Sequence, residues 1–143
     1  MERFLALVLG LVGLAALLYS LVKIRAGRVA EYFVFLVLLV ASGIGVVYAR
    51  NLLVIFAFWE IAALALWRLV AFYRGEEELA AANWAWLVNF GSAALMLVGL
   101  GLILVERGTL SLDVLRGQSL PFWPATLVLV GILAKSWAAW TVR

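Results

Sequence analysis

The segment NLLVIFAFWEIAALALWRLVAFYRG, residues 51–75, decides the fold of this protein. It is an apolar run of helix length that holds a single carboxylate, Glu60. About 20 apolar residues span a bilayer at a rise of 1.5 Å per residue, so Glu60 lies roughly 12 Å in from Leu52, near the bilayer midplane. A charge at that depth costs about 2.5–3.5 kcal/mol on the insertion scale, so Glu60 needs a partner, a proton or a water-filled cavity.

The composition of the whole chain also requires a membrane. Of its 143 residues, 68% are hydrophobic and only 13% are charged, and the mean hydropathy is +1.16. A soluble domain of this length could not cover so much apolar surface with polar side chains. We therefore expect an integral membrane protein that lies in contact with the lipid bilayer.

The residue types that are missing exclude several kinds of chemistry. The chain has no cysteine and no histidine, which excludes disulfides, haem ligation, thiolate chemistry and histidine proton relays. Zinc and iron–sulfur sites would have only carboxylates as ligands. The net charge of +3 is scattered along the sequence and forms no basic stripe for nucleic acid. We expect no catalytic centre, no cofactor, no metal site and no nucleic-acid partner in this chain.

Five apolar segments predict five spanning helices in one all-α membrane domain over residues 1–143. The segments are residues 4–22, 32–49, 52–72, 80–105 and 121–140. A cleaved secretory signal is the alternative for residues 1–22, but the uncharged run is longer than a signal core of about 7–15 residues and no A-x-A site follows it. Within the one substantial loop, residues 106–120, the amphipathic stretch SLDVL predicts a short interfacial turn of helix.

The basic residues of the short loops predict the orientation in the membrane. One predicted side carries Lys23, Arg25, Arg28, Arg74 and Arg143, and the other carries Arg3, Arg50, Arg107 and Arg116. The cluster that follows the first helix dominates, so we expect the N-terminus outside and the C-terminus in the cytoplasm. Several of the seven tryptophans fall at predicted interfaces, where an aromatic belt explains them.

Two residues are candidates for ion transfer. Intramembrane acids usually mark ion pathways, and this favours a functional Glu60 over a neutral carboxylic acid that only bonds a neighbouring helix. Lys135 lies about 21 Å along the last helix from Pro121, within reach of the inner half of the membrane. On position alone, Lys135 is equally well explained as a snorkelling interfacial anchor. A Glu60–Lys135 pair would form a proton-handling unit.

Other polar residues of the spans have simpler explanations. Arg68 lies about 24 Å past Leu52 and is expected to reach the cytoplasmic face as an anchor. Asn89 and Ser92 lie on the fourth helix, where hydrogen bonds between helices explain them. We keep Arg68, Asn89 and Ser92 as supporting residues of an ion pathway.

Three stretches together give a resemblance to a known family. They are NLLVIFAFWEIAAL, WLVNFGSAALMLVGLGLILVERGTLSLDVL and LVGILAKS, and the resemblance runs over roughly residues 32–136. In order and spacing they resemble the antiporter-like subunits of respiratory complex I, membrane-bound hydrogenases and multisubunit sodium/proton antiporters. The resemblance implies that Glu60 is the acid of the family's fifth helix and that Lys135 is the lysine of its seventh.

The resemblance also has departures. Family members contain two inverted repeats, and this sequence matches only part of the first. The sequence WAAWTVR stands where the family has a stretch similar to Pro-Phe-His-x-Trp, and Ser92 stands at a position that holds an acid in the family. We therefore expect a shortened antiporter-like subunit or a fragment of one.

The resemblance implies proton transfer through Glu60 and Lys135, with Glu60 setting the proton affinity of the lysine. The partners would be other polytopic subunits of a proton- or sodium-translocating complex, such as an NADH:quinone oxidoreductase or a hydrogenase-type complex. The expected location is the inner (plasma) membrane of a bacterium or archaeon. Two alternatives remain: a structural membrane subunit without a working ion pathway, and a small proton-coupled exporter that uses Glu60 in a homo-oligomer.

Overall fold

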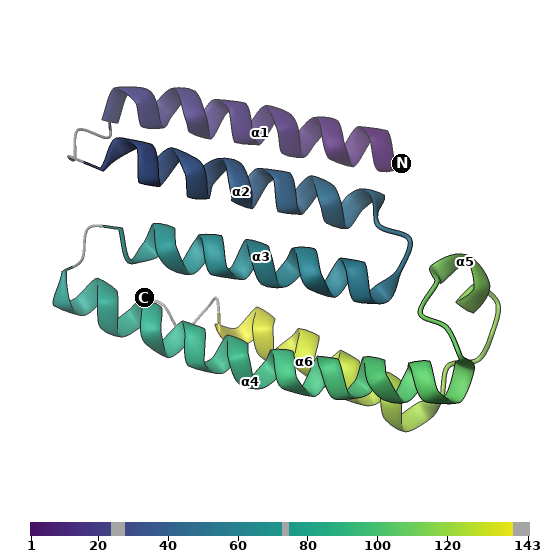
Figure 1. Ribbon diagram of the computed structural model, residues 1–143. Coiled ribbons are helices and arrows are strands. Elements are labelled where there is room, and N and C mark those ends of the chain that lie inside the picture. Colours follow the sequence, from purple (N-terminus) through teal and green to yellow (C-terminus); the bar gives the residue numbers. More distant parts are fainter. Residues whose placement is uncertain (24–27, 73–74, 139–143) are drawn as a thin grey trace.

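The computed structural model describes residues 1–23, 28–72 and 75–138 and is helical over most of that length (Figure 1). Its helices are α1 (Glu2–Lys23), α2 (Val29–Tyr48), α3 (Leu52–Val70), α4 (Glu76–Arg107), α5 (Leu112–Leu115) and α6 (Phe122–Ala138). Helices α1 to α4 are long and apolar enough to cross a membrane, and α6 is a shorter apolar helix. This confirms the predicted all-α polytopic fold.

The ends of α3 and α4 differ from the predicted boundaries. Helix α3 ends at Val70 rather than at residue 72, because the α-helical pattern gives way to a tighter turn in which the Phe72 N–H donates to the Leu69 carbonyl at 3.2 Å. Helix α4 begins at Glu76 rather than at residue 80, because the Gly75 carbonyl already accepts a helical hydrogen bond and the helix dipole favours an acid in the first turn. Its other end is fixed by Gly108, whose φ of 69° suits glycine.

Helices α1 and α2 also begin slightly before the predicted positions, at Glu2 and Val29. Residues 139–140 of the predicted fifth span lie outside the described residues. The same is true of Arg25, Arg74 and Arg143, on which part of the predicted orientation depends.

The helices follow one another as antiparallel neighbours (Figure 1). Helix α1 packs on α2, α2 on α3, α3 on α4, and α4 on α6, which is the most extensive of these contacts. In the described part of the chain, α6 makes no extensive backbone contact with α3. We call the two ends of the bundle the α5 end, where helix α5 lies, and the Gly75 end, where Gly75 precedes α4.

The α5 end is closed by the connection between α4 and α6. Its Leu110 and Leu115 are buried against Leu100 and Ile103 of α4, and Leu52, Phe56 and Val128 pack on this cluster. Backbone hydrogen bonds fix the connection to the start of α3: the Leu52 N–H donates to the Leu110 carbonyl at 2.9 Å, and the Leu112 N–H donates to the Arg50 carbonyl at 2.8 Å. A packed apolar layer therefore separates this end from the middle of the bundle.

Two glycines let α4 and α6 approach each other closely. A Cβ at Gly99 would lie 2.8 Å from the Pro124 carbonyl oxygen, and a Cβ at Gly131 would lie 2.9 Å from the Ser92 carbonyl oxygen. Real Cβ atoms are not found at such distances, so a larger residue at either position would force the two helices apart. The spacing of α4 and α6 therefore depends on Gly99 and Gly131.

We expect Gly131→Ala to lower the stability of the protein by about 1–3 kcal/mol, because the added methyl group overpacks the α4–α6 contact. Gly101 on α4 is the matched control, since a Cβ there would meet no atom within 4 Å. Gly101→Ala should be neutral or stabilising by about 0.5–1 kcal/mol, as expected for a helical glycine. Thermal unfolding in mild detergent checks both, and equal effects of the two changes would contradict this packing.

Candidate functional site

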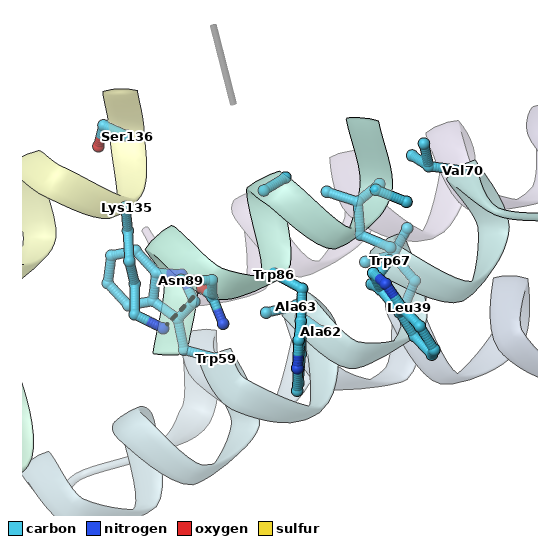
Figure 2. A pocket seen from close by; sticks show the side chains of 13 residues that line it. Leu39, Trp59, Ala62, Ala63, Trp67, Val70, Trp86, Asn89, Lys135 and Ser136 are labelled. Atoms are coloured by element: carbon cyan, nitrogen blue, oxygen red, sulfur yellow. Dashed lines mark hydrogen bonds between the residues drawn. The ribbon is translucent and has the colours of Figure 1, made fainter. Parts of the chain in front are cut away.

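Three polar side chains from three helices meet inside the bundle. The Lys135 ammonium on α6 donates to Oε1 of Glu60 on α3, and it donates to Oδ1 of Asn89 on α4 at 3.0 Å. Asn89 completes the group, because its Nδ2 donates to Oε2 of Glu60 at 3.4 Å. Figure 2 shows the Lys135 side chain directed at Asn89. The structure thus brings together the two principal candidates of the sequence and one of the three supporting residues.

The packing of α4 on α6 explains why Lys135 reaches this place. Gly131 lies against Ser92, at one of the two close approaches of these helices. Because the helices are antiparallel, one turn forward along α6 from Gly131 corresponds to one turn back along α4 from Ser92. Lys135 is one turn beyond Gly131, so its side chain comes level with Asn89. The close approach at Gly131 therefore sets the position of Lys135 relative to Asn89.

The burial of the pair is uneven. The Lys135 side chain is 3% exposed, while the Glu60 side chain is 27% exposed. Removing one member of a buried ion pair leaves the other charge uncompensated, which costs far more than the pair itself contributes. Lys135 therefore depends on Glu60 and Asn89, and its ammonium is directed into the bundle and not outward.

The amide of Asn89 is oriented to suit both charges. Its oxygen accepts from the ammonium and its nitrogen donates to the carboxylate, so each end faces the group that it stabilises. The nearby Ser92 hydroxyl donates to the backbone carbonyl of Asn89 at 2.8 Å. Ser92 supports the turn of α4 that carries the amide, and its hydroxyl is engaged by that carbonyl.

Arg68 lies apart from this group. Its guanidinium forms an ion pair with Oε1 of Glu31 on α2, and Arg28 contributes a second contact to Oε2 at 3.4 Å. Arg68 follows Glu60 by eight residues, about 12 Å along α3. The Arg68–Glu31 pair therefore ties α3 to α2 near the Gly75 end.

Glu31 was not predicted as a site residue, because the apolar pattern places it in the loop before the second predicted span. Helix α2 begins at Val29, which places Glu31 in its first turn and level with the last turn of α3. An arginine inside an apolar span needs an acid at the same depth on a neighbouring helix, and this requirement could have pointed to Glu31.

A cavity of about 530 Å³ lies beside Lys135 and Asn89 (Figure 2). Its lining comes from α2, α3, α4 and α6: Leu39, Trp59, Ala62, Ala63, Leu66, Trp67, Val70, Ala82, Ala85, Trp86, Asn89, Lys135 and Ser136. Four alanines leave the space open and three indoles bound it, of which Trp67 and Trp86 lie with ring centroids 5.7 Å apart. Glu60 is not among the described residues that line the cavity.

The described residues hold no cluster of three or more histidine, cysteine, aspartate or glutamate side chains that could bind a metal ion. The chemical groups at the site are therefore an amine, a carboxyl group and an amide. The amine and the carboxyl group can exchange a proton, whereas the amide can only give and accept hydrogen bonds.

Comparison with known proteins places these features in a family. The model of the family described as NADH:quinone oxidoreductase/Mrp antiporter, transmembrane, matches residues 49–142, a range that contains Glu60, Asn89 and Lys135. The NAD(P)H-quinone oxidoreductase chain 4 of Lepidium virginicum chloroplasts is 34% identical over 127 residues, covering 86% of this chain and 25% of the relative.

Two bacterial relatives are named as components of antiporters. A Na(+)/H(+) antiporter subunit of Alkalihalophilus pseudofirmus is 32% identical over 143 residues, covering 92% of this chain and 18% of the relative. The putative antiporter subunit mnhA2 of Staphylococcus saprophyticus is 28% identical over 123 residues, covering 83% of this chain and 15% of the relative. The chain thus spans a quarter or less of the length of each of these three relatives.

Proposed function

This chain belongs to the NADH:quinone oxidoreductase/Mrp antiporter family of transmembrane proteins, and on that premise we propose that it carries an ion-transfer step in a proton- or sodium-translocating membrane complex. The observation that carries the proposal is the contact between the Lys135 ammonium and the Glu60 carboxylate inside the spanning helices. Such residues are expensive within a membrane and usually mark an ion pathway.

The proposed chemistry is proton exchange within the pair. When the Lys135 ammonium gives a proton to the Glu60 carboxylate, a neutral amine and a neutral carboxylic acid result. The pair has no net charge before or after this step, so the transfer avoids leaving an isolated charge in the bilayer. A proton then enters at the amine, and the carboxyl group afterwards releases its proton, which completes one passage.

Access from one end supports this role. The cavity extends from Lys135 and Asn89 to Val70 and Ala82, the last of these in the second turn of α4, and so toward the Gly75 end. At the α5 end, Leu110 and Leu115 belong to a packed cluster, and the cavity that lies there, of about 250 Å³, is lined by residues such as Ile55 and Leu112 and not by Lys135 or Asn89. We propose that ions reach Lys135 from the Gly75 end.

The basic residues support an orientation for this route. The distribution of lysine and arginine favours the Gly75 end in the cytoplasm and the α5 end, with the N-terminus, outside. Relatives come from chloroplasts as well as from bacteria, and we keep a bacterial or archaeal plasma membrane as the proposed location.

Partner subunits are part of the proposal. The relatives are named as a chain or a subunit of larger assemblies. The exposed part of Glu60 would face lipid in an isolated chain, so another polytopic subunit or helix is needed to cover it. Any redox chemistry would belong to other chains of such a complex.

A structural role is the second candidate, and one observation favours it. Helices α3 and α6 share no extensive backbone contact in the described part of the chain, so the Lys135–Glu60 pair also holds them together. A structural subunit would need this pair for assembly but not for translocation, and transport measurements separate the two roles.

We expect Glu60→Gln to lower ion translocation by roughly a hundredfold while assembly survives, because glutamine keeps the hydrogen-bonding size but cannot carry the proton. Lys135→Met should have a similar effect. The double variant should be little worse than either single one, because both residues serve one step. The measurement is pH-gradient formation in vesicles that hold the assembled complex at matched subunit levels, with and without sodium.

The matched control is Glu106→Gln, which removes an exposed carboxylate at the end of α4 and should leave translocation unchanged. Normal translocation by Glu60→Gln would refute the proton-transfer role and leave the structural role in its place. A gradient that forms only with sodium would identify sodium as the coupled ion.

Single cysteines test the access route and the orientation, since the chain has no native cysteine. A small membrane-impermeant thiosulfonate should label Ala85→Cys in the cavity from the cytoplasmic side only, and Gln118→Cys beyond α5 from the outside only. Ala94→Cys lies on an exposed face of α4, outside the cavity lining; we expect it to face lipid and to stay unlabelled from both sides. Labelling of Ala85→Cys from the outside would contradict both the route and the orientation.

A further inference from the structure

Hydrogen bonding between helices does not by itself explain the position of Asn89 beside the cavity. It lines the cavity together with Lys135, whereas Glu60 is absent from the described lining. The exposed part of Glu60 therefore lies outside this cavity. Of the ion pair, only Lys135 is described as lining the cavity, and the amide of Asn89 hydrogen-bonds to both members.

The Lys135 ammonium has two acceptors of different kinds. Glu60 accepts as a carboxylate, and this attraction is lost when the carboxyl group takes up a proton. Asn89 accepts through an amide oxygen at 3.0 Å, and an amide does not change its charge in the physiological pH range. Asn89 is thus the acceptor that remains when Glu60 becomes neutral.

We propose that Asn89 is a positioning residue that holds the Lys135 ammonium at the cavity while Glu60 is protonated. This inference rests on the proposed function, since it concerns the same ion-transfer step. Without a second acceptor, protonation of Glu60 would leave an ammonium inside the membrane with no partner among the described residues, which is costly. Asn89 lowers that cost and lets Glu60 exchange its proton.

The second hydrogen bond of Asn89 is the weaker of the two. Its Nδ2 lies 3.4 Å from Oε2 of Glu60, near the limit for a hydrogen bond, whereas the bond from the ammonium is shorter and charge-assisted. The loss of the amide should therefore act mainly through Lys135. The Ser92 hydroxyl bond and the close approach at Gly131 keep the amide level with the ammonium.

A hydrophobic carbodiimide provides a readout besides transport, because it modifies protonated carboxyl groups in apolar surroundings. We expect Asn89→Leu to reduce the modification of Glu60 by roughly tenfold, since the protonated state then leaves the ammonium without an acceptor. Asn89→Asp should increase it, because a second carboxylate can hold the ammonium. Both variants should slow translocation.

The measurement is peptide mass spectrometry of carbodiimide-treated vesicles that hold the assembled complex. Modification is counted relative to the unmodified Glu60 peptide, and modification of Glu31, whose ion pair with Arg68 does not involve Asn89, should stay at the wild-type level in both variants. Asn83→Leu is the matched control, an exposed asparagine on the same helix, and should leave both readouts unchanged.

Asn89→Leu and Asn89→Asp distinguish a positioning role of Asn89 from a purely structural one. If Asn89 were merely structural, its replacement would loosen the site. Both changes would then raise the modification of Glu60 or leave it at the level of Asn83→Leu, and either result would overturn the inference. If Asn89→Leu does not assemble, Asn89→Asp decides alone, and no rise in modification would refute the proposal. Normal translocation by Glu60→Gln in the same vesicles would refute the proposed function instead.

Discussion

An ammonium and a carboxylate placed inside apolar helices must meet, because each alone is expensive to bury. Lys135 lies on α6, which packs on α4, while Glu60 lies on α3. The contact between Glu60 and Lys135 therefore joins α3 to the pair formed by α4 and α6. It becomes possible because Gly131 brings α6 close to α4 one turn before the lysine, and Asn89 of α4 completes the group. The fold of the C-terminal half can be understood as the support for this contact.

The surroundings of the pair differ at its two sides. Toward the α5 end, leucines of the connection between α4 and α6 pack on Leu100 and Ile103 of α4, and backbone hydrogen bonds fix this connection to the start of α3. Toward the Gly75 end, small alanines leave a cavity of about 530 Å³ that reaches the lysine and the amide. Alternating packed and open regions of this kind are what a one-sided ion path requires, whereas a structural pair would need only the contact itself.

The sequence predicted the features that follow from hydropathy. Apolar runs of sufficient length gave the spanning helices, and the depth of Glu60 followed from the rise per residue. The sequence could not decide the position of Lys135, because snorkelling and burial are equally compatible with its place near a helix end. The close approach of α6 to α4 at Gly131, which is visible only in the structure, decides where the lysine lies. The Glu31–Arg68 pair was missed because the start of α2 was placed too late, and the cavity depends on which alanines face each other.

A charge-swapped pair tests the account most directly. The measurement is the thermal midpoint of the assembled protein for Glu60→Lys, for Lys135→Glu and for the double variant that carries both changes. Each single change places like charges together and should destabilise strongly, since breaking a buried pair costs about 3–5 kcal/mol. The double variant should recover most of the wild-type midpoint, because it restores an ion pair between α3 and α6. A double variant as unstable as the two single effects added together would show that Glu60 and Lys135 do not depend on each other, and would contradict the account.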